Sequence, residues 1–86
     1  MSKMYIGIDV SQKTFDVAYP KGSGIGTFQI RNDFGGFSEF KALLEGLGTA
    51  AHCVMEASGP YYLQLATFLF EAGIGVSVVN PLVVKR

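Results

Sequence analysis

Two acidic residues, Asp9 and Glu56, each lie near the end of an apolar segment, residues 4–10 and 51–57 respectively. If these segments are neighbouring parallel strands, both carboxylates reach one edge of the sheet, just outside the carboxyl ends of the strands, where open α/β sheets bind ligands. Two partly buried carboxylates side by side repel each other, so they require a cation or a shared proton. Hard oxygen ligands suit Mg²⁺, or Mn²⁺ in its place, and no cluster of His and Cys offers zinc a site. Asp9 and Glu56 therefore predict a site for a divalent cation.

These acids also have a plainer interpretation. A lone acidic residue at a strand end is usually solvated, and only the pair on consecutive parallel strands favours a metal site. Asp16 is expected on the exposed face of a hairpin strand, with a minor chance of lying near the metal. Asp33 is expected to cap a helix, as is the alternative Asn32, because either side chain accepts hydrogen bonds from the first helical turn.

One histidine and one cysteine, His52 and Cys53, are adjacent in the chain. Neighbouring residues of a strand point to opposite faces, so these two side chains are not expected to form a nucleophilic pair. The single cysteine also excludes an internal disulfide and a metal–thiolate cluster.

The elements that position the acids follow from hydrophobic periodicity and turn residues. Residues 4–10 have the pattern of a central strand covered on both faces. We expect strands at residues 4–10, 14–19, 25–30, 51–57 and 74–79. A first helix is expected to begin at residue 34 and to end at Gly46 and Gly48, and a second to span about residues 60–72 with Ser58 as its cap. The second helix is apolar nearly all round, so it is expected to be buried on more than one side.

The order of these elements is β-β-β-α-β-α-β. The first three strands are joined by hairpins and are antiparallel, whereas the first, fourth and fifth are joined through helices and are parallel. This is the plan of an α/β fold of the ribonuclease H-like (RuvC-like) type, with a mixed five-stranded sheet. Asn80 and Pro81 look like the start of another helix, so we expect residues 1–86 to be the N-terminal part of a larger domain.

Composition limits the classes of function. With 86 residues, of which 49% are hydrophobic and 16% charged, the chain is expected to form one core and not to be disordered. The formal net charge is zero, so no overall basic field attracts nucleic acid or an anionic membrane. No signal peptide or membrane span is apparent, and we expect a cytoplasmic protein.

Four motifs along the chain resemble a known family: YIGIDVSQKTFDVA at residues 5–18, NDFGGF at 32–37, MEASG at 55–59 with Tyr61 and Tyr62, and VVNP at 78–81. They occur in the right order over nearly the whole chain. The chain resembles the N-terminal domain of DEDD transposases, which comprise the insertion-sequence one-ten transposases and the related Piv-type DNA invertases.

The resemblance implies a RuvC-like nuclease fold in which four acids, Asp-Glu-Asp-Asp, hold a divalent metal for DNA strand cleavage and transfer. The first Asp falls on Asp9 and the Glu on Glu56, whereas the closing Asp pair would follow residue 81 and is not in this sequence. The implied partners are DNA and, for some members, an element-encoded guide RNA, in a bacterial or archaeal cell. With half of the acids, the isolated chain is expected to be inactive, and exposed apolar residues around Tyr62, Leu65, Phe68 and Leu69 are expected to promote homo-oligomers.

Two other interpretations stay open at this stage. Actin-like ATPases and sugar kinases also begin with Gly-Ile-Asp on their first strand, although their phosphate loop usually has Gly and Thr or Ser directly after the acid, where this chain has Val10 and Ser11. Alternatively, the chain is a non-catalytic half-domain that serves oligomerisation.

Overall fold

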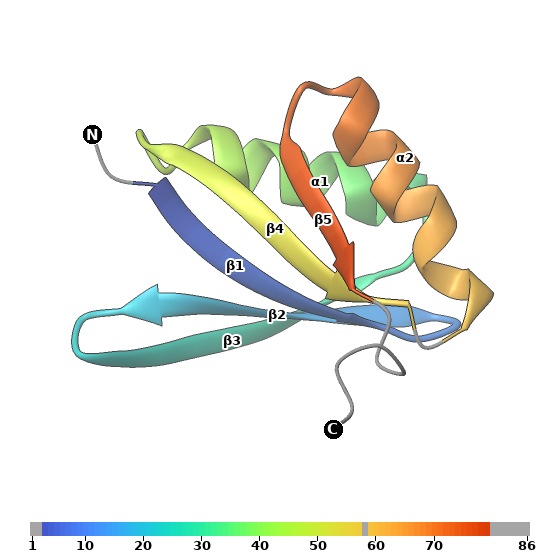
Figure 1. Cartoon of the computed structure of the whole chain (residues 1–86), viewed down its shortest axis with the longest axis horizontal. Helices are drawn as coiled ribbons and strands as arrows, with labels where there is room; N and C mark the ends of the chain where they lie inside the picture. The colour runs from blue at the N-terminus through green and yellow to red at the C-terminus, as the bar shows by residue number, and fades with distance from the viewer. Residues whose placement is uncertain (1–2, 58, 80–86) are drawn as a thin grey trace.

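A computed structural model describes residues 3–57 and 59–79 of the chain. Its elements along the sequence are β1 (Lys3–Val10), β2 (Thr14–Lys21), β3 (Gly24–Arg31), α1 (Phe34–Glu45), β4 (Ala50–Glu56), the 3-10 turn η1 (Pro60–Tyr62), α2 (Leu63–Glu71) and β5 (Gly75–Val79). The strands form one sheet in the order β3-β2-β1-β4-β5. Figure 1 shows α1 and α2 on the same side of this sheet.

The sheet has the predicted mixture of strand directions. β1 pairs antiparallel with β2, and β2 pairs antiparallel with β3. β4 lies parallel to β1 on one side and to β5 on the other. The sequence-based order of elements, the two hairpins and the place of β1 at the centre of the sheet are therefore confirmed.

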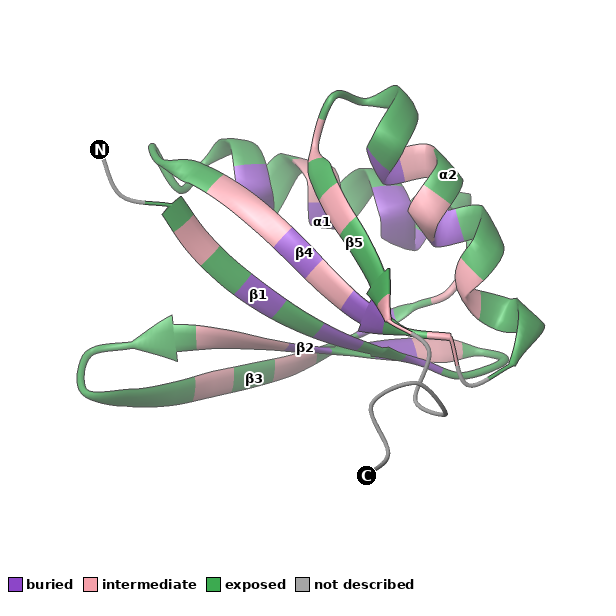
Figure 2. Ribbon diagram, viewed as in Figure 1, coloured by how far each residue is buried: buried purple, intermediate pink, exposed green. Residues whose placement is uncertain are grey.

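The core lies between the sheet and the two helices. Alternate residues of β1 point into it, so that Ile6, Ile8 and Val10 are buried while Tyr5 and Asp9 are exposed. Figure 2 shows the buried positions on β1, β4, α1 and α2. The full set of buried apolar residues is Ile6, Ile8, Val10, Phe15, Val17, Ile30, Phe37, Phe40, Leu44, Cys53, Met55, Leu65 and Leu69.

The expectation that β1 is covered on both faces is wrong for the described residues. Both helices lie on one side of the sheet, so the other face, which we call the open face, has no helix over it. The alternation of exposed and buried residues along β1 is the pattern of a strand that is half-buried.

Helix α1 begins at the predicted place. Asp33, and not Asn32, is the cap: its Oδ1 accepts a hydrogen bond of 2.8 Å from the N–H of Gly36. Phe37, Phe40 and Leu44 of α1 are buried, and the ring of Phe40 packs edge-on against that of Phe15, with centroids 5.4 Å apart. Phe34 and Leu43 of the same helix, and Leu47 just after it, are exposed although they follow the same spacing of three and four residues.

Helix α2 differs from its prediction. Its first turn is the separate η1, which starts at Pro60, while the predicted cap Ser58 lies outside the described residues. Only Leu65 and Leu69 of α2 are buried, whereas Leu63 is 53% and Phe70 75% exposed. The prediction of a helix buried on more than one side is therefore wrong, because α2 packs only against the helix side of the sheet and α1.

The predicted self-association surface changes for the same reason. Leu65 and Leu69 face the core and cannot contact another molecule without unfolding, and Tyr62 and Phe68 are half-buried. The exposed apolar side chains of this region are instead Phe34, Tyr61, Leu63 and Phe70. Homo-oligomerisation itself stays a prediction.

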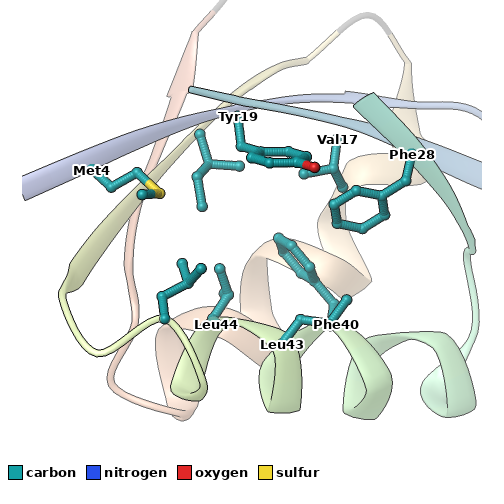
Figure 3. Close-up of a pocket in the computed structure, with 9 residues that line it drawn as sticks. Met4, Val17, Tyr19, Phe28, Phe40, Leu43 and Leu44 are labelled. Atoms are coloured by element: carbon teal, nitrogen blue, oxygen red, sulfur yellow. The ribbon is translucent and has the colours of Figure 1, made fainter. Parts of the chain in front are cut away.

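An apolar pocket of about 220 Å³ opens between the sheet and the C-terminal half of α1. Figure 3 shows side chains of β1, β2 and β3 above it and side chains of α1 below it. Its lining consists of Met4, Ile6, Val17, Tyr19, Phe28, Phe40, Leu43, Leu44 and Leu47. Because it lies on the helix side of the sheet, it is separate from Asp9 on the open face.

Helices long and apolar enough to cross a membrane are absent from residues 3–57 and 59–79.

Candidate functional site

The parallel pairing of β1 and β4 brings Asp9 and Glu56 together. Gly7 lies level with Val54 and Ile8 with Met55, and the two acids come next on their strands. Side chains of adjacent parallel strands at equivalent positions point to the same face. Both carboxylates are therefore on the open face, on neighbouring strands at the carboxyl ends.

A shallow groove of about 500 Å³ runs over this part of the open face. It is lined by Gly7, Ile8, Asp9, Asp16, Val17, Ala18, Thr27, Val54, Met55, Glu56 and Val79. Three of these residues are acidic and none is basic, so we call it the acidic groove. An added Cβ at Gly7 would meet only the Cβ of Ala18, at 4.0 Å, which leaves the backbone beside Asp9 accessible.

Asp9 and Glu56 are both exposed, whereas the sequence led us to expect partly buried carboxylates. The physical reason is the open face: a residue at a strand end is buried only if something covers its side of the sheet. Within the described ranges neither carboxylate has a hydrogen bond or an ion pair, and the two ion pairs join Arg31 to Asp33 and Lys41 to Glu45. Both carboxylates are therefore available to a ligand.

Asp16 lies directly opposite Asp9 across the antiparallel pairing of β1 and β2. It is exposed, as predicted, and its Oδ1 accepts a hydrogen bond of 2.9 Å from Nε2 of Gln29 on β3. Like charges directly opposite each other on antiparallel strands are destabilising. The acids therefore form a row across β4, β1 and β2, in which Asp9 is central.

From the sequence we expected Asp16 on the exposed face of a hairpin strand, with a minor chance of lying near the metal, and its position opposite Asp9 was not predicted. The signal that could have shown this is the length of the hairpin. Val10 pairs with Phe15 across the four residues 11–14, and the next residues outward along the hairpin, 9 and 16, must then face each other.

The ligand atoms of Asp9 and Glu56 are of the type that a hard divalent cation prefers, but two side chains are too few to hold it alone. Carboxylate oxygens are the ligands preferred by Mg²⁺ and Mn²⁺. However, no three His, Cys, Asp or Glu side chains in the part of the chain that the structure describes lie close enough together to hold a metal ion. Asp9 and Glu56 thus fit such an ion as two of its ligands, and the remaining ligands must come from water, substrate or other residues.

A second polar cluster lies on the open face near the other end of β1. Nε2 of His52 and Oγ of Ser77 are 2.7 Å apart, and the ring of His52 lies 5.8 Å from that of Tyr5. Cys53 points to the opposite side and is fully buried, which confirms that His52 and Cys53 form no pair. Burial raises the pKa of the Cys53 thiol to about 11, so it is a poor nucleophile near neutral pH.

The fold matches those of several solved proteins. The chain is similar to RuvC of T. thermophilus, solved in complex with a Holliday junction substrate, with a TM-score of 0.63 and 10% identity over 94% of this chain and 66% of that one. It is similar to the Pelota protein of Thermoplasma acidophilum, with a TM-score of 0.57 and 10% identity over 90% of this chain and 27% of that one. It is also similar to the PPX-GPPA enzyme of Aquifex aeolicus, with a TM-score of 0.52 and 14% identity over 92% of this chain and 36% of that one.

At these identities the solved structures show the fold alone. The similarity to RuvC confirms the ribonuclease H-like, RuvC-like class predicted from the order of the elements.

Two curated proteins are more similar in sequence. The pilin gene-inverting proteins of Moraxella bovis and Moraxella lacunata are each 33% identical to this chain over 85 residues. The match covers 95% of this chain but only 26% of each relative, so the chain spans about a quarter of their length.

A family model described as a transposase of the DEDD type, DEDD_Tnp_IS110, matches residues 6–86, which include Asp9, Asp16 and Glu56 of the groove and all four motifs apart from Tyr5. The match confirms the resemblance that the motifs indicated. The chain belongs to the DEDD transposase family of the insertion-sequence one-ten type.

Proposed function

We propose that this chain supplies the first half of the catalytic centre of a DNA transposase or DNA invertase, in which Asp9 and Glu56 hold a divalent cation. The observation that carries the proposal is the position of the two carboxylates, at the ends of adjacent parallel strands and in one groove. The family match supports DNA as the substrate, and the motif positions support these two acids as the first Asp and the Glu of the acidic tetrad.

Each residue of the proposed site has a role that follows from its place. Asp9, at the centre of the row, and Glu56 bind Mg²⁺ or Mn²⁺ through carboxylate oxygens. A bound ion would stabilise the charge that develops on phosphate oxygens during strand cleavage and transfer. Gly7 leaves the strand backbone beside Asp9 free for a phosphate group to approach.

Two carboxylates alone provide a weak site. Divalent ions in phosphoryl-transfer centres are held by several ligands, and a two-metal clamp needs more than this chain offers. We therefore expect the 86-residue chain to bind the ion weakly and to leave DNA uncleaved by itself. The complete activity belongs to a protein that also carries the closing Asp pair.

The proposal can be tested by titrating the chain with Mn²⁺ and following free Mn²⁺ by electron paramagnetic resonance. Glu56→Gln and Asp9→Asn should each weaken binding by ~10-fold or more, because each removes one of two anionic ligands. Glu39→Gln is the matched control, since Glu39 is an exposed acid on α1 outside the groove. Equal Mn²⁺ affinities of the unaltered chain and Glu56→Gln would contradict the proposal.

A further inference from the structure

Asn32 connects two loops that belong to different parts of the sheet. Its side-chain amide Nδ2 donates to the carbonyl oxygen of Ser11 at 3.0 Å and is 3.4 Å from that of Gln12. The same Nδ2 is 3.3 Å from the carbonyl oxygen of Tyr61, which it also contacts as a donor. The main-chain N–H of Asn32 donates to the carbonyl of Lys13 at 2.8 Å. One residue at the junction of β3 and α1 therefore binds both loops.

The two loops are the continuations of the strands that carry the acids. Ser11 to Lys13 form the turn that follows Asp9 at the end of β1. Tyr61 lies in η1, which follows Glu56 after the end of β4. Asn32 thus joins the segment beyond one carboxylate to the segment beyond the other.

The pairing of β1 with β4 places the two acids on neighbouring strands but stops just before them. Pairing between β1 and β4 ends at Ile8 and Met55, so Asp9 and Glu56 lie one residue beyond the last paired position. Asp9 is held on its other side by β2, and Glu56 by its pairing with Val79 of β5. Beyond the ladder, the amide of Asn32 provides a hydrogen-bonded contact from the β1 side to the β4 side.

The amide of Asn32 suits this position because it is a hydrogen-bond donor surrounded by carbonyl oxygens. Its NH₂ group offers two hydrogens to carbonyl acceptors that would otherwise lack this donor. An aspartate would present a charged acceptor to the same carbonyl oxygens and would repel them. The Oδ1 atom of Asn32 is buried and has no partner among the described residues, so the hydrogen bonds that hold the side chain are those donated by Nδ2.

The neighbours of Asn32 keep its backbone in place. Asp33 caps α1, and Gly36 lets the first turn of α1 approach the end of β3 closely. The NDFGGF motif therefore builds a rigid support for one side-chain amide. Helix capping does not explain the role of the Asn32 amide, because the side-chain cap of α1 comes from Asp33.

We propose that Asn32 is a positioning residue for the metal site, which it serves by holding the loops after Asp9 and Glu56 at a fixed separation. This inference rests on the proposed function, in which those two acids bind a divalent cation. It adds a residue that touches neither the ion nor the substrate but sets the distance between the two ligands.

The test compares Asn32→Asp and Asn32→Ala with Ile30→Val. The first variant replaces the donor by an acceptor of the same shape, and the second removes it without adding charge. Ile30→Val, in β3 two residues earlier, costs ~0.5–1.5 kcal/mol of core stability and leaves the loop contacts intact. Circular dichroism first establishes conditions in which each variant is fully folded, so that a general loss of stability does not affect the readouts.

Two readouts are measured on the folded chains. Mn²⁺ affinity should fall ~10-fold in both Asn32 variants and stay unchanged in Ile30→Val. In the Glu56→Gln background, Asn32→Ala should have no further effect, because the distance between two ligands is irrelevant when one is lost. In the metal-free chain, nuclear Overhauser contacts between backbone protons of residues 9 and 56 should weaken in the Asn32 variants alone.

The outcomes separate the inference from the function on which it rests. If the unaltered chain binds no Mn²⁺, the proposed function fails. If it binds Mn²⁺ and both Asn32 variants bind equally well, the function stands and the positioning role is overturned. Unchanged contacts between residues 9 and 56 in the metal-free Asn32 variants would also overturn it, whether or not the ion binds.

Discussion

Gly36 is the position at which a single methyl group should have the largest effect on this fold. It lies in the first turn of α1, where that turn passes over the end of β3. An ideal Cβ built at Gly36 would overlap the carbonyl oxygen of Arg31 and lie 2.9 Å from both the Arg31 carbonyl carbon and Cγ2 of Ile30. Two of these three atoms are backbone, so side-chain rotation cannot relieve the contact, and α1 must move away from β3.

The cost of Gly36→Ala can be worked from this geometry. Overpacking against a rigid neighbour costs ~1–3 kcal/mol, and a shift of α1 also weakens the cap from Asp33 to the Gly36 N–H, worth ~0.5–2 kcal/mol. Alanine is the better helix former by ~0.5–1 kcal/mol, which offsets part of the loss. We expect a net destabilisation of about 0.5–4.5 kcal/mol, with a central value of about 2.5 kcal/mol. Each kcal/mol lowers the melting temperature by about 4–8 °C in a domain of this size.

Gly35→Ala is the matched control, one residue earlier in the same turn. There an added Cβ would lie 3.2 Å from Nη2 of Arg31 and 3.4 Å from Oδ1 of Asp33, and the Arg31 side chain can move. This variant should be neutral or up to ~1 kcal/mol more stable, from helix propensity alone. Urea denaturation followed by circular dichroism measures both variants. Equal stabilities of Gly35→Ala and Gly36→Ala would refute the close approach of α1 to β3.

Two further predictions concern charge. Asp9→Asn should stabilise the metal-free chain by ~0.2–1 kcal/mol, because it removes one of two carboxylates that face each other across β1 and β2. Thermal melting in the presence of a chelator measures this effect, with Glu39→Gln as the control. A lower melting temperature for Asp9→Asn than for the unaltered chain would contradict the prediction. For Cys53, the pKa in the folded chain is raised from 9.0 to about 11 by burial, so the stability gained by keeping the thiol neutral is complete below about pH 9 and is lost as the pH rises toward 11. The difference in unfolding free energy between the unaltered chain and Cys53→Ala should therefore narrow over that range, and a constant difference would be inconsistent with a buried neutral thiol.

The sheet could be predicted from the sequence because each strand depends on local patterns. The alternation in residues 14–19 and 25–30, and the Gly-rich turn between them, are sufficient to define the β2–β3 hairpin. The adjacency of Asp9 and Glu56 followed from the connection of parallel strands through a helix. The open face could not be predicted, because the apolar run of β1 is the same whether one or two of its faces are covered.

The exposure of α2 could not be predicted for a related reason. Its sequence is apolar nearly all round, and periodicity says how many faces are suited to burial but not which neighbours are present. Leu65 and Leu69 are buried in the core against the sheet, whereas Phe70 is exposed. The contacts of Asn32 could not be predicted either. Its position next to Asp33 suggests a helix cap, and its partners Ser11 and Tyr61 are 21 and 29 residues away in the sequence.

The family match also bears on the alternative of an actin-like ATPase or sugar kinase. Such proteins share the opening strand and hairpin, so the fold could not distinguish them from a transposase. The distinction came from the motifs at residues 32–37 and 55–59, which lie outside the shared opening and fall within the matched family region.

The acidic groove makes the proposed binding of DNA at this surface sensitive to divalent ions. Three carboxylates line the groove without a basic neighbour among its lining residues, so they repel a phosphodiester chain. A dication held by the carboxylates offsets that repulsion. If the groove binds DNA as proposed, its apparent affinity should therefore rise with the concentration of divalent ions, in opposition to the ordinary weakening of DNA binding by salt.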